Sequence, residues 1–119
     1  SIDTAKEDLA ERMRCVFELA GAKFTTSGAY SGWIPLPDTP IISTMKEVYK
    51  KLFGTEMKVT AIHAGLECAL LGAKYPNWDM VSFGPTIKYP HSPDERVKID
   101  TVDKCWKFLK SVLENIPEK

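Results

Sequence analysis

Segments with helical periodicity alternate along this chain with short segments that have the composition of strands. Apolar residues recur about every 3.6 positions in the helical segments. The intervening segments are short and rich in apolar, β-branched or aromatic residues. In chain order we predict helix 3–21, strand 22–30, helix 40–53, strand 57–62, helix 64–72, strand 79–83 and helix 100–116. This alternation predicts an α/β fold, in which a layered sheet is flanked by helices.

Each of the three longer helices has an apolar stripe. We expect the stripe of the second helix to be buried, whereas residues 1–30 could either fold back onto the sheet or project from it with the helix face exposed. In the first helix the stripe consists of Ala5, Leu9, Met13, Val16, Phe17 and Ala20. In the second it consists of Ile42, Met45, Val48, Tyr49, Leu52 and Phe53. In the last it consists of Val102, Trp106, Leu109, Val112, Leu113 and Ile116.

The composition excludes several classes of protein. Lysine and arginine together number 16, as do aspartate and glutamate, so the chain offers no basic field for nucleic acid. No apolar run approaches the roughly 18 residues that cross a bilayer, and the N-terminus lacks the layout of a signal peptide. Cys15, Cys68 and Cys105 are odd in number and widely spaced, which favours free thiols in a reducing cytoplasm.

A proline-rich connector separates the first helix and strand from the rest of the chain. Pro35, Pro37 and Pro40 fall within six residues, which makes this stretch a poor helix and a poor central strand. We therefore place a domain boundary between residues 1–32 and 33–119. The alternative is a long surface loop with Trp33 packed on a core.

Both histidines of the chain follow predicted strands. His63 ends the strand at 57–62, and His91 lies in the loop that leaves the strand at 79–83. Parallel neighbouring strands would bring both residues to the same edge of the sheet, where ligands bind in open α/β folds. Ser92 and Glu95 have capping-box spacing, which predicts a fixed backbone beside His91. Each histidine is equally compatible with a hydrogen-bonded residue at the sheet edge.

A zinc site within the chain is a further possibility. His63, Cys68 and His91 reach the three ligands that a catalytic zinc needs, but they lack the short spacing of a zinc finger. Cys68 is equally compatible with a small buried helix residue. Glu67, on the first turn of a predicted helix, is compatible with a salt bridge, a cap or a substrate contact.

Several motifs resemble those of aminoacyl-histidine dipeptidases, also called Xaa-His or cytosol nonspecific dipeptidases, which are co-catalytic zinc peptidases. The resemblance covers essentially the whole chain. Its motifs are His63-Ala64-Gly65-Leu66-Glu67-Cys68, Gly84-Pro85-Thr86-Ile87, His91-Ser92-Pro93-Asp94-Glu95-Arg96-Val97, Tyr30-Ser31-Gly32-Trp33 and Trp106-Lys107-Phe108-Leu109. Ala69 departs from the pattern, because it stands where the family is expected to have glycine.

The resemblance implies that His91 is a metal ligand and that His63, Gly65 and Glu67 border the substrate cleft. It implies two zinc ions in each active site of the full-length enzyme, a dipeptide substrate and a homodimer. The remaining ligands, the general base and the arginine that grips the substrate carboxylate have no counterpart here. We therefore expect the C-terminal quarter of such an enzyme, inactive and without tightly bound zinc when isolated.

The resemblance also implies roles for the two predicted domains. Residues 1–32 would close the lid, or dimerisation, domain with a helix and a strand, and residues 33–119 would complete the catalytic domain. Two other hypotheses remain open at this point. One is a stand-alone α/β binding or assembly module without catalysis, and the other is a small protein with a single zinc held by His63, Cys68 and His91.

Overall fold

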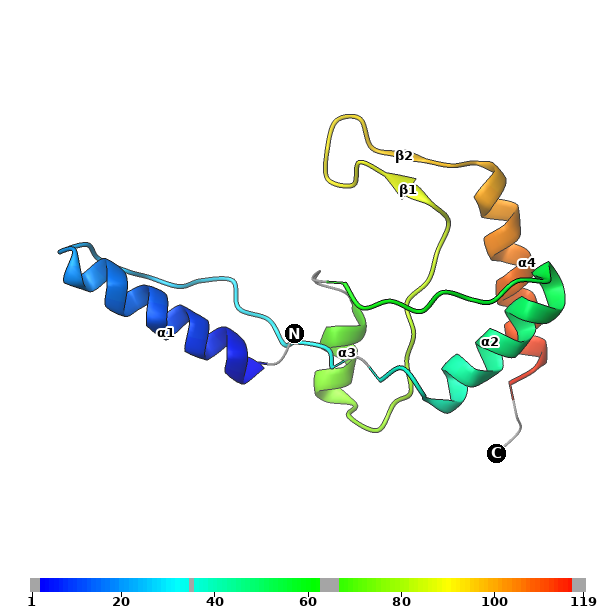
Figure 1. Cartoon of the computed structure of the whole chain (residues 1–119), viewed down its shortest axis with the longest axis horizontal. Coiled ribbons are helices and arrows are strands. Elements are labelled where there is room, and N and C mark those ends of the chain that lie inside the picture. Colours follow the sequence, from blue (N-terminus) through cyan, green and yellow to red (C-terminus); the bar gives the residue numbers. More distant parts are fainter. Residues whose placement is uncertain (1–2, 35, 63–66, 117–119) are drawn as a thin grey trace. The chain divides into compact units, whose positions relative to one another are not determined.

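The structure, a computed structural model, describes residues 3–34, 36–62 and 67–116. Its elements are α1 (Asp3–Leu19), α2 (Pro40–Phe53), α3 (Glu67–Lys74), β1 (Ile87–Lys88), β2 (Arg96–Val97) and α4 (Asp100–Glu114) (Figure 1). The chain divides into two compact units. Unit 1 comprises Ser1–Leu36 and Ala61–Trp78, and unit 2 comprises Pro37–Thr60 and Asp79–Lys119.

The core of unit 2 lies where α2 packs against α4. Its buried members are Met45, Val48, Phe108 and Val112, and Met45 is only 1% exposed. The Phe108 ring lies edge-on to Tyr49 and Phe83, with centroids 5.3 Å apart in both pairs. Aromatic pairs in such geometry contribute beyond the area that they bury. Phe108 and Val112 are therefore the residues through which α4 contributes to the core of unit 2.

The buried face of α4 differs from the predicted stripe. Phe108 was not part of that stripe, whereas Trp106 was and is 55% exposed. Val112 belongs to the predicted stripe and is buried, but the stripe as a whole does not match the buried face, because apolar residues occupy more than one face of α4 and periodicity alone does not select the face that packs. A smaller correction applies to α2, in which Leu52 is 42% exposed although we expected it to be buried.

Two residues fix the ends of α2. Asp79, which is distant in sequence, binds its start, and Gly54, with a left-handed backbone, ends it. The backbone N–H of Ile41 donates to Oδ2 of Asp79 at 2.8 Å, while Thr39 makes no side-chain cap bond. A carboxylate at this position satisfies a free N–H group and complements the helix dipole. At the other end Gly54 adopts φ 66°, and its N–H donates to the carbonyl of Lys50. Asp79 thereby ties the start of α2 to the segment 79–83.

The three predicted strands do not form strands in this structure. Segments 22–30, 57–62 and 79–83 lack ladder pairing, and the pairing within the described residues is between β1 and β2. A strand is defined by hydrogen bonds to a neighbour, which local sequence does not supply. Met57 and Val81 nevertheless pack against the core of unit 2. The chain therefore mixes helices with a small antiparallel sheet.

In unit 1 the segment that follows α1 runs back along the helix (Figure 1). Phe24 stacks on Phe17 at 5.8 Å, and the N–H of Gly32 donates to Oδ1 of Asp3 at 2.8 Å. No residue of α1 is buried, and Leu9 is 59% exposed. The apolar stripe of α1 is thus exposed within the described chain, one of the two arrangements that the sequence left open for residues 1–30, and Phe24 stacks on one member of that stripe, Phe17.

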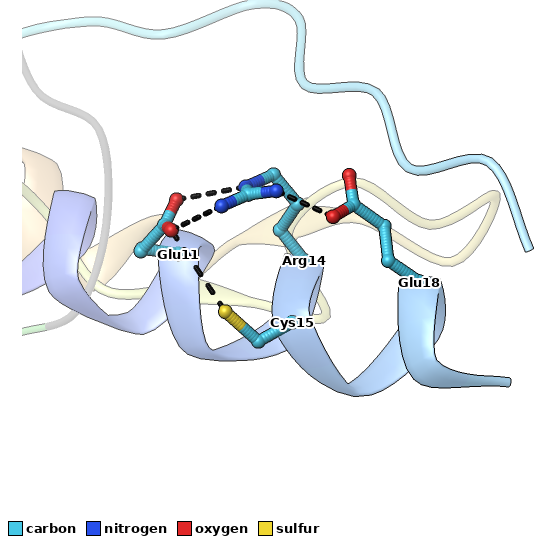
Figure 2. A network of polar contacts seen from close by, with 4 residues as sticks. All are labelled: Glu11, Arg14, Cys15 and Glu18. Carbon is cyan, nitrogen blue, oxygen red and sulfur yellow. Dashed lines mark hydrogen bonds and ion pairs between the residues drawn. The ribbon is translucent and has the colours of Figure 1, made fainter.

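The polar face of α1 carries a charged network, shown in Figure 2. Arg14 lies between Glu11 and Glu18 and donates to both, with Nε of Arg14 at 2.9 Å from Oε2 of Glu11. The hydrogen bond from Arg14 lowers the pKa of the Glu11 carboxyl, and the two carboxylates raise the pKa of Arg14. Because these groups are exposed, the network adds little stability.

The state of the cysteines and the character of the helices can be compared with the sequence predictions. Cys15, Cys68 and Cys105 are all free thiols, as predicted. Within the described residues, no helix combines the length and the apolar character needed to cross a membrane.

Candidate functional site

His91 lies at the tip of the β1–β2 hairpin. The two strands are antiparallel, and their register pairs Ile87 with Val97 and Lys88 with Arg96. We call the connecting residues, 89–95, the His91 loop. The predicted irregular loop at 84–97 is therefore a short hairpin. Its base is tied to α4, because the N–H of Thr86 donates to Oγ1 of Thr101 at 2.9 Å.

The backbone of the His91 loop is held in an unusual conformation. Tyr89 and His91 have φ values of 54° and 63°, in the left-handed region that residues other than glycine seldom adopt. The N–H of His91 donates to Oε2 of Glu95 at 2.9 Å. The N–H groups of Asp94 and Glu95 donate to the hydroxyl and the carbonyl of Ser92, both at 3.0 Å. These bonds keep the loop in one conformation.

The sequence predicted a fixed backbone here, but for a different structural reason. The prediction rested on the capping-box spacing of Ser92 and Glu95, in which Glu95 would accept from the N–H of Ser92. Glu95 instead accepts from the N–H of His91, and β2 follows at once. The guanidinium of Arg96 lies 5.1 Å from the centroid of the Tyr89 ring and closes the loop. Sequence reasoning missed both contacts, because neither has a local signature.

His91 is suited to binding a metal as one ligand of several. His91 is exposed, and its backbone N–H donates a hydrogen bond to Glu95. Neutral imidazole is a good ligand for zinc, which takes about three protein ligands in catalytic sites. No group of three or more His, Cys, Asp or Glu residues able to hold a metal occurs in the part of the chain that the structure describes. Within the described residues, His91 is therefore not joined by a second and third metal-ligating group.

The other predicted site residues are His63, Gly65 and Glu67. His63 and Gly65 fall outside the described residues, so their predicted positions remain predictions. Glu67 begins α3 and is exposed, and its carboxylate forms no hydrogen bond or ion pair with the described residues. Cys68 follows on the same turn and is half-buried. Among the alternatives raised for Glu67, a salt bridge is thus not formed here.

A surface hollow of about 350 Å³ lies on unit 2. It is lined by Thr44, Glu47, Val48, Lys51 and Asn115. The lining combines one buried valine with charged and polar groups. Since no predicted ligand or cleft residue borders it, the hollow does not help to assign chemistry to the chain.

Comparison with known proteins identifies the family. Residues 13–115 match peptidase family M20/M25/M40. The chain belongs to this family. Its sequence is 44% identical to the cytosol non-specific dipeptidase of Escherichia coli K12, over 99% of this chain and 24% of that protein. It is 24% identical to the succinyl-diaminopimelate desuccinylase of Sulfurovum sp. NBC37-1, over 96% of this chain and 30% of that protein.

A solved structure agrees with this assignment to the M20 family. The crystal structure of aminoacylhistidine dipeptidase from Vibrio alginolyticus superposes with a TM-score of 0.78 and 50% identity, over 99% of this chain and 24% of that one. The resemblance to aminoacyl-histidine dipeptidases is thereby confirmed. The chain spans about a quarter of the length of both dipeptidases that it matches.

Proposed function

We propose that this chain is the C-terminal quarter of a metal-dependent dipeptidase that hydrolyses aminoacyl-histidine and related dipeptides. One observation carries the proposal: 99% of the chain matches two dipeptidases, at 44% and 50% identity. The match extends along nearly the whole chain, so no segment of it requires a different assignment. A stand-alone binding module, the alternative from sequence, is favoured by no comparable observation.

The role that we assign to His91 is to supply one imidazole to one of two zinc ions in the complete active site. Bound zinc polarises the scissile carbonyl and activates a water for attack. The part played by this chain is to present the ring in a fixed place. The hydrogen bond from His91 N–H to Glu95 supports that role, since it holds the backbone before any metal arrives.

The residues assigned to the substrate cleft are His63, Gly65 and Glu67. Gly65 lacks a side chain and would offer its backbone N–H to the dipeptide. Glu67 supports the assignment because its carboxylate is exposed on the first turn of α3 and makes no ion pair with the described residues. Its exposure leaves the carboxylate accessible to a substrate.

The proposal extends to the architecture and the location of the whole enzyme. Residues 1–32 would close its lid, which forms a homodimer, and residues 33–119 would complete a catalytic domain built on a layered sheet. Segments 57–62 and 79–83 would pair there with strands from other parts of the enzyme. Support comes from their strand-like composition and from Met57 and Val81 packing on α2 and α4. A cytoplasmic location is supported by the name of the E. coli relative.

A chimeric enzyme tests the proposal. This chain would replace the matching quarter of the E. coli dipeptidase, with the unaltered E. coli enzyme as the reference. We expect the chimera to hydrolyse β-alanyl-histidine. This chain would supply His91, and the E. coli part would supply the other metal ligands and the general base. The 119-residue chain alone should neither turn over dipeptide nor hold stoichiometric zinc. A folded chimera without turnover, or an active isolated chain, would contradict the proposal.

A further inference from the structure

We propose that Glu95 is the positioning residue that sets His91 for metal binding, an inference that rests on the proposed function. It acts through a hydrogen bond to the backbone of His91, so it touches neither metal nor substrate. The inference assigns to Glu95 a role in the metal affinity of the complete enzyme.

The starting point is the backbone conformation of His91. At φ 63° this residue occupies a region that L-amino acids adopt only when the surrounding structure imposes it. Its N–H donates to Oε2 of Glu95 at 2.9 Å. A hydrogen bond to a carboxylate is stronger than one to a neutral acceptor. The Glu95 carboxylate therefore stabilises the backbone conformation from which the His91 side chain extends.

Glu95 is itself held from both sides. Its own N–H donates to the carbonyl of Ser92 at 3.0 Å. The next residue, Arg96, is paired with Lys88 in the hairpin and lies over the Tyr89 ring. An acceptor anchored in this way restrains its donor more effectively than a side chain on a free loop. The restraint on His91 is therefore transmitted to the β1–β2 ladder.

Neighbouring groups do not duplicate this restraint. The Ser92 hydroxyl already accepts from the N–H of Asp94 at 3.0 Å. The Asp94 carboxylate, one residue before Glu95, forms no hydrogen bond or ion pair with any described residue. Without the Glu95 carboxylate, the N–H of His91 would be hydrogen-bonded only by solvent. The left-handed conformation of His91 would then lose the acceptor that stabilises it. The D94A substitution is a matched control, because it also removes a carboxylate from the same loop.

The experiment compares E95A, E95Q and D94A in the chimera with the E. coli dipeptidase. Zinc affinity is measured by competition with a chelator, and the Co²⁺-substituted proteins are compared by visible absorption. Hydrogen exchange of residues 86–98 in the metal-free proteins reports the order of the loop. Thermal melting checks that the variants fold.

We expect E95A to weaken zinc binding about 10–100-fold, the range typical for residues that orient a metal ligand. E95A should also speed exchange in the loop of the metal-free protein and alter the Co²⁺ spectrum. E95Q retains an acceptor oxygen and should recover most of the zinc affinity. D94A should match the unaltered chimera in all three measurements.

Two results would overturn the inference. One is an E95A protein that binds zinc as tightly as the unaltered chimera. The other is an equal loss in E95A and E95Q, which would mean that charge and not the backbone hydrogen bond is responsible. H91A separates this inference from the proposed function. If H91A loses zinc and E95A does not, only the role of Glu95 is rejected, whereas unchanged zinc binding in H91A rejects the ligand assignment itself.

Discussion

The H91A substitution in the chimera is expected to lower zinc affinity and dipeptide turnover by more than about 100-fold, beyond the range for residues that merely orient a ligand. The physical reason is that a catalytic zinc has only about three protein ligands, so the loss of one leaves the ion weakly held and wrongly placed. Zinc competition and the hydrolysis of β-alanyl-histidine give the two readouts. Because His91 is exposed, its removal should leave the melting temperature of the metal-free protein nearly unchanged.

The C68S substitution is the companion to H91A. In a protein with one zinc held by His63, Cys68 and His91, the loss of the thiolate would abolish tight binding as completely as H91A. In the proposed dipeptidase Cys68 is a half-buried helix residue, and C68S should retain tight zinc binding. Equal losses in H91A and C68S would therefore favour the small zinc protein and count against the dipeptidase.

The F108A substitution is expected to destabilise unit 2 by about 3–5 kcal/mol, the usual cost of truncating a buried aromatic residue. Phe108 is buried, and its ring contacts Tyr49, Phe53 and Phe83. A loss of this size is a large part of the stability of any small domain. Urea unfolding of the 119-residue chain, followed by circular dichroism, measures the change.

The W106A substitution is the matched control for F108A. It removes another aromatic ring from α4, but Trp106 is exposed and lies on a different face of the helix. Its cost should be within about 0.5 kcal/mol, as for surface positions. If W106A destabilised the chain as much as F108A, the buried face predicted from sequence would be the correct one and the packing of α4 on α2 would be wrong.

The helices of unit 2 could be predicted because their signals are local. Pro40 and Gly54 mark the ends of α2, and the predicted range agrees with the observed one. The strands could not, since the composition of 57–62 and 79–83 indicates a strand without supplying its partner. The face of α4 was ambiguous for a related reason. Apolar residues surround much of that helix, and the rings that select Phe108 come from α2 and from Phe83, outside the helix.

The candidate site shows the same division between local and tertiary information. The motif that begins at His91 was sufficient to suggest the family, and the comparison with the two dipeptidases bears this out. The spacing of Ser92 and Glu95 correctly indicated a backbone held beside His91, but it did not identify the N–H group from which Glu95 accepts. A capping box and this hairpin tip place the same residue types at the same spacing. The partner of Glu95 is decided by the register of β1 with β2, which lies outside the motif.

The most direct measurement for the central claim is a crystal structure of the zinc-loaded chimera, with data collected on both sides of the zinc absorption edge. The account predicts an anomalous peak about 2.0–2.1 Å from a ring nitrogen of His91, the normal length of a zinc–imidazole bond. Glu95 should still accept from the His91 N–H in that structure. Zinc bound in the active site with His91 beyond bonding distance would contradict the claim that this chain supplies a metal ligand.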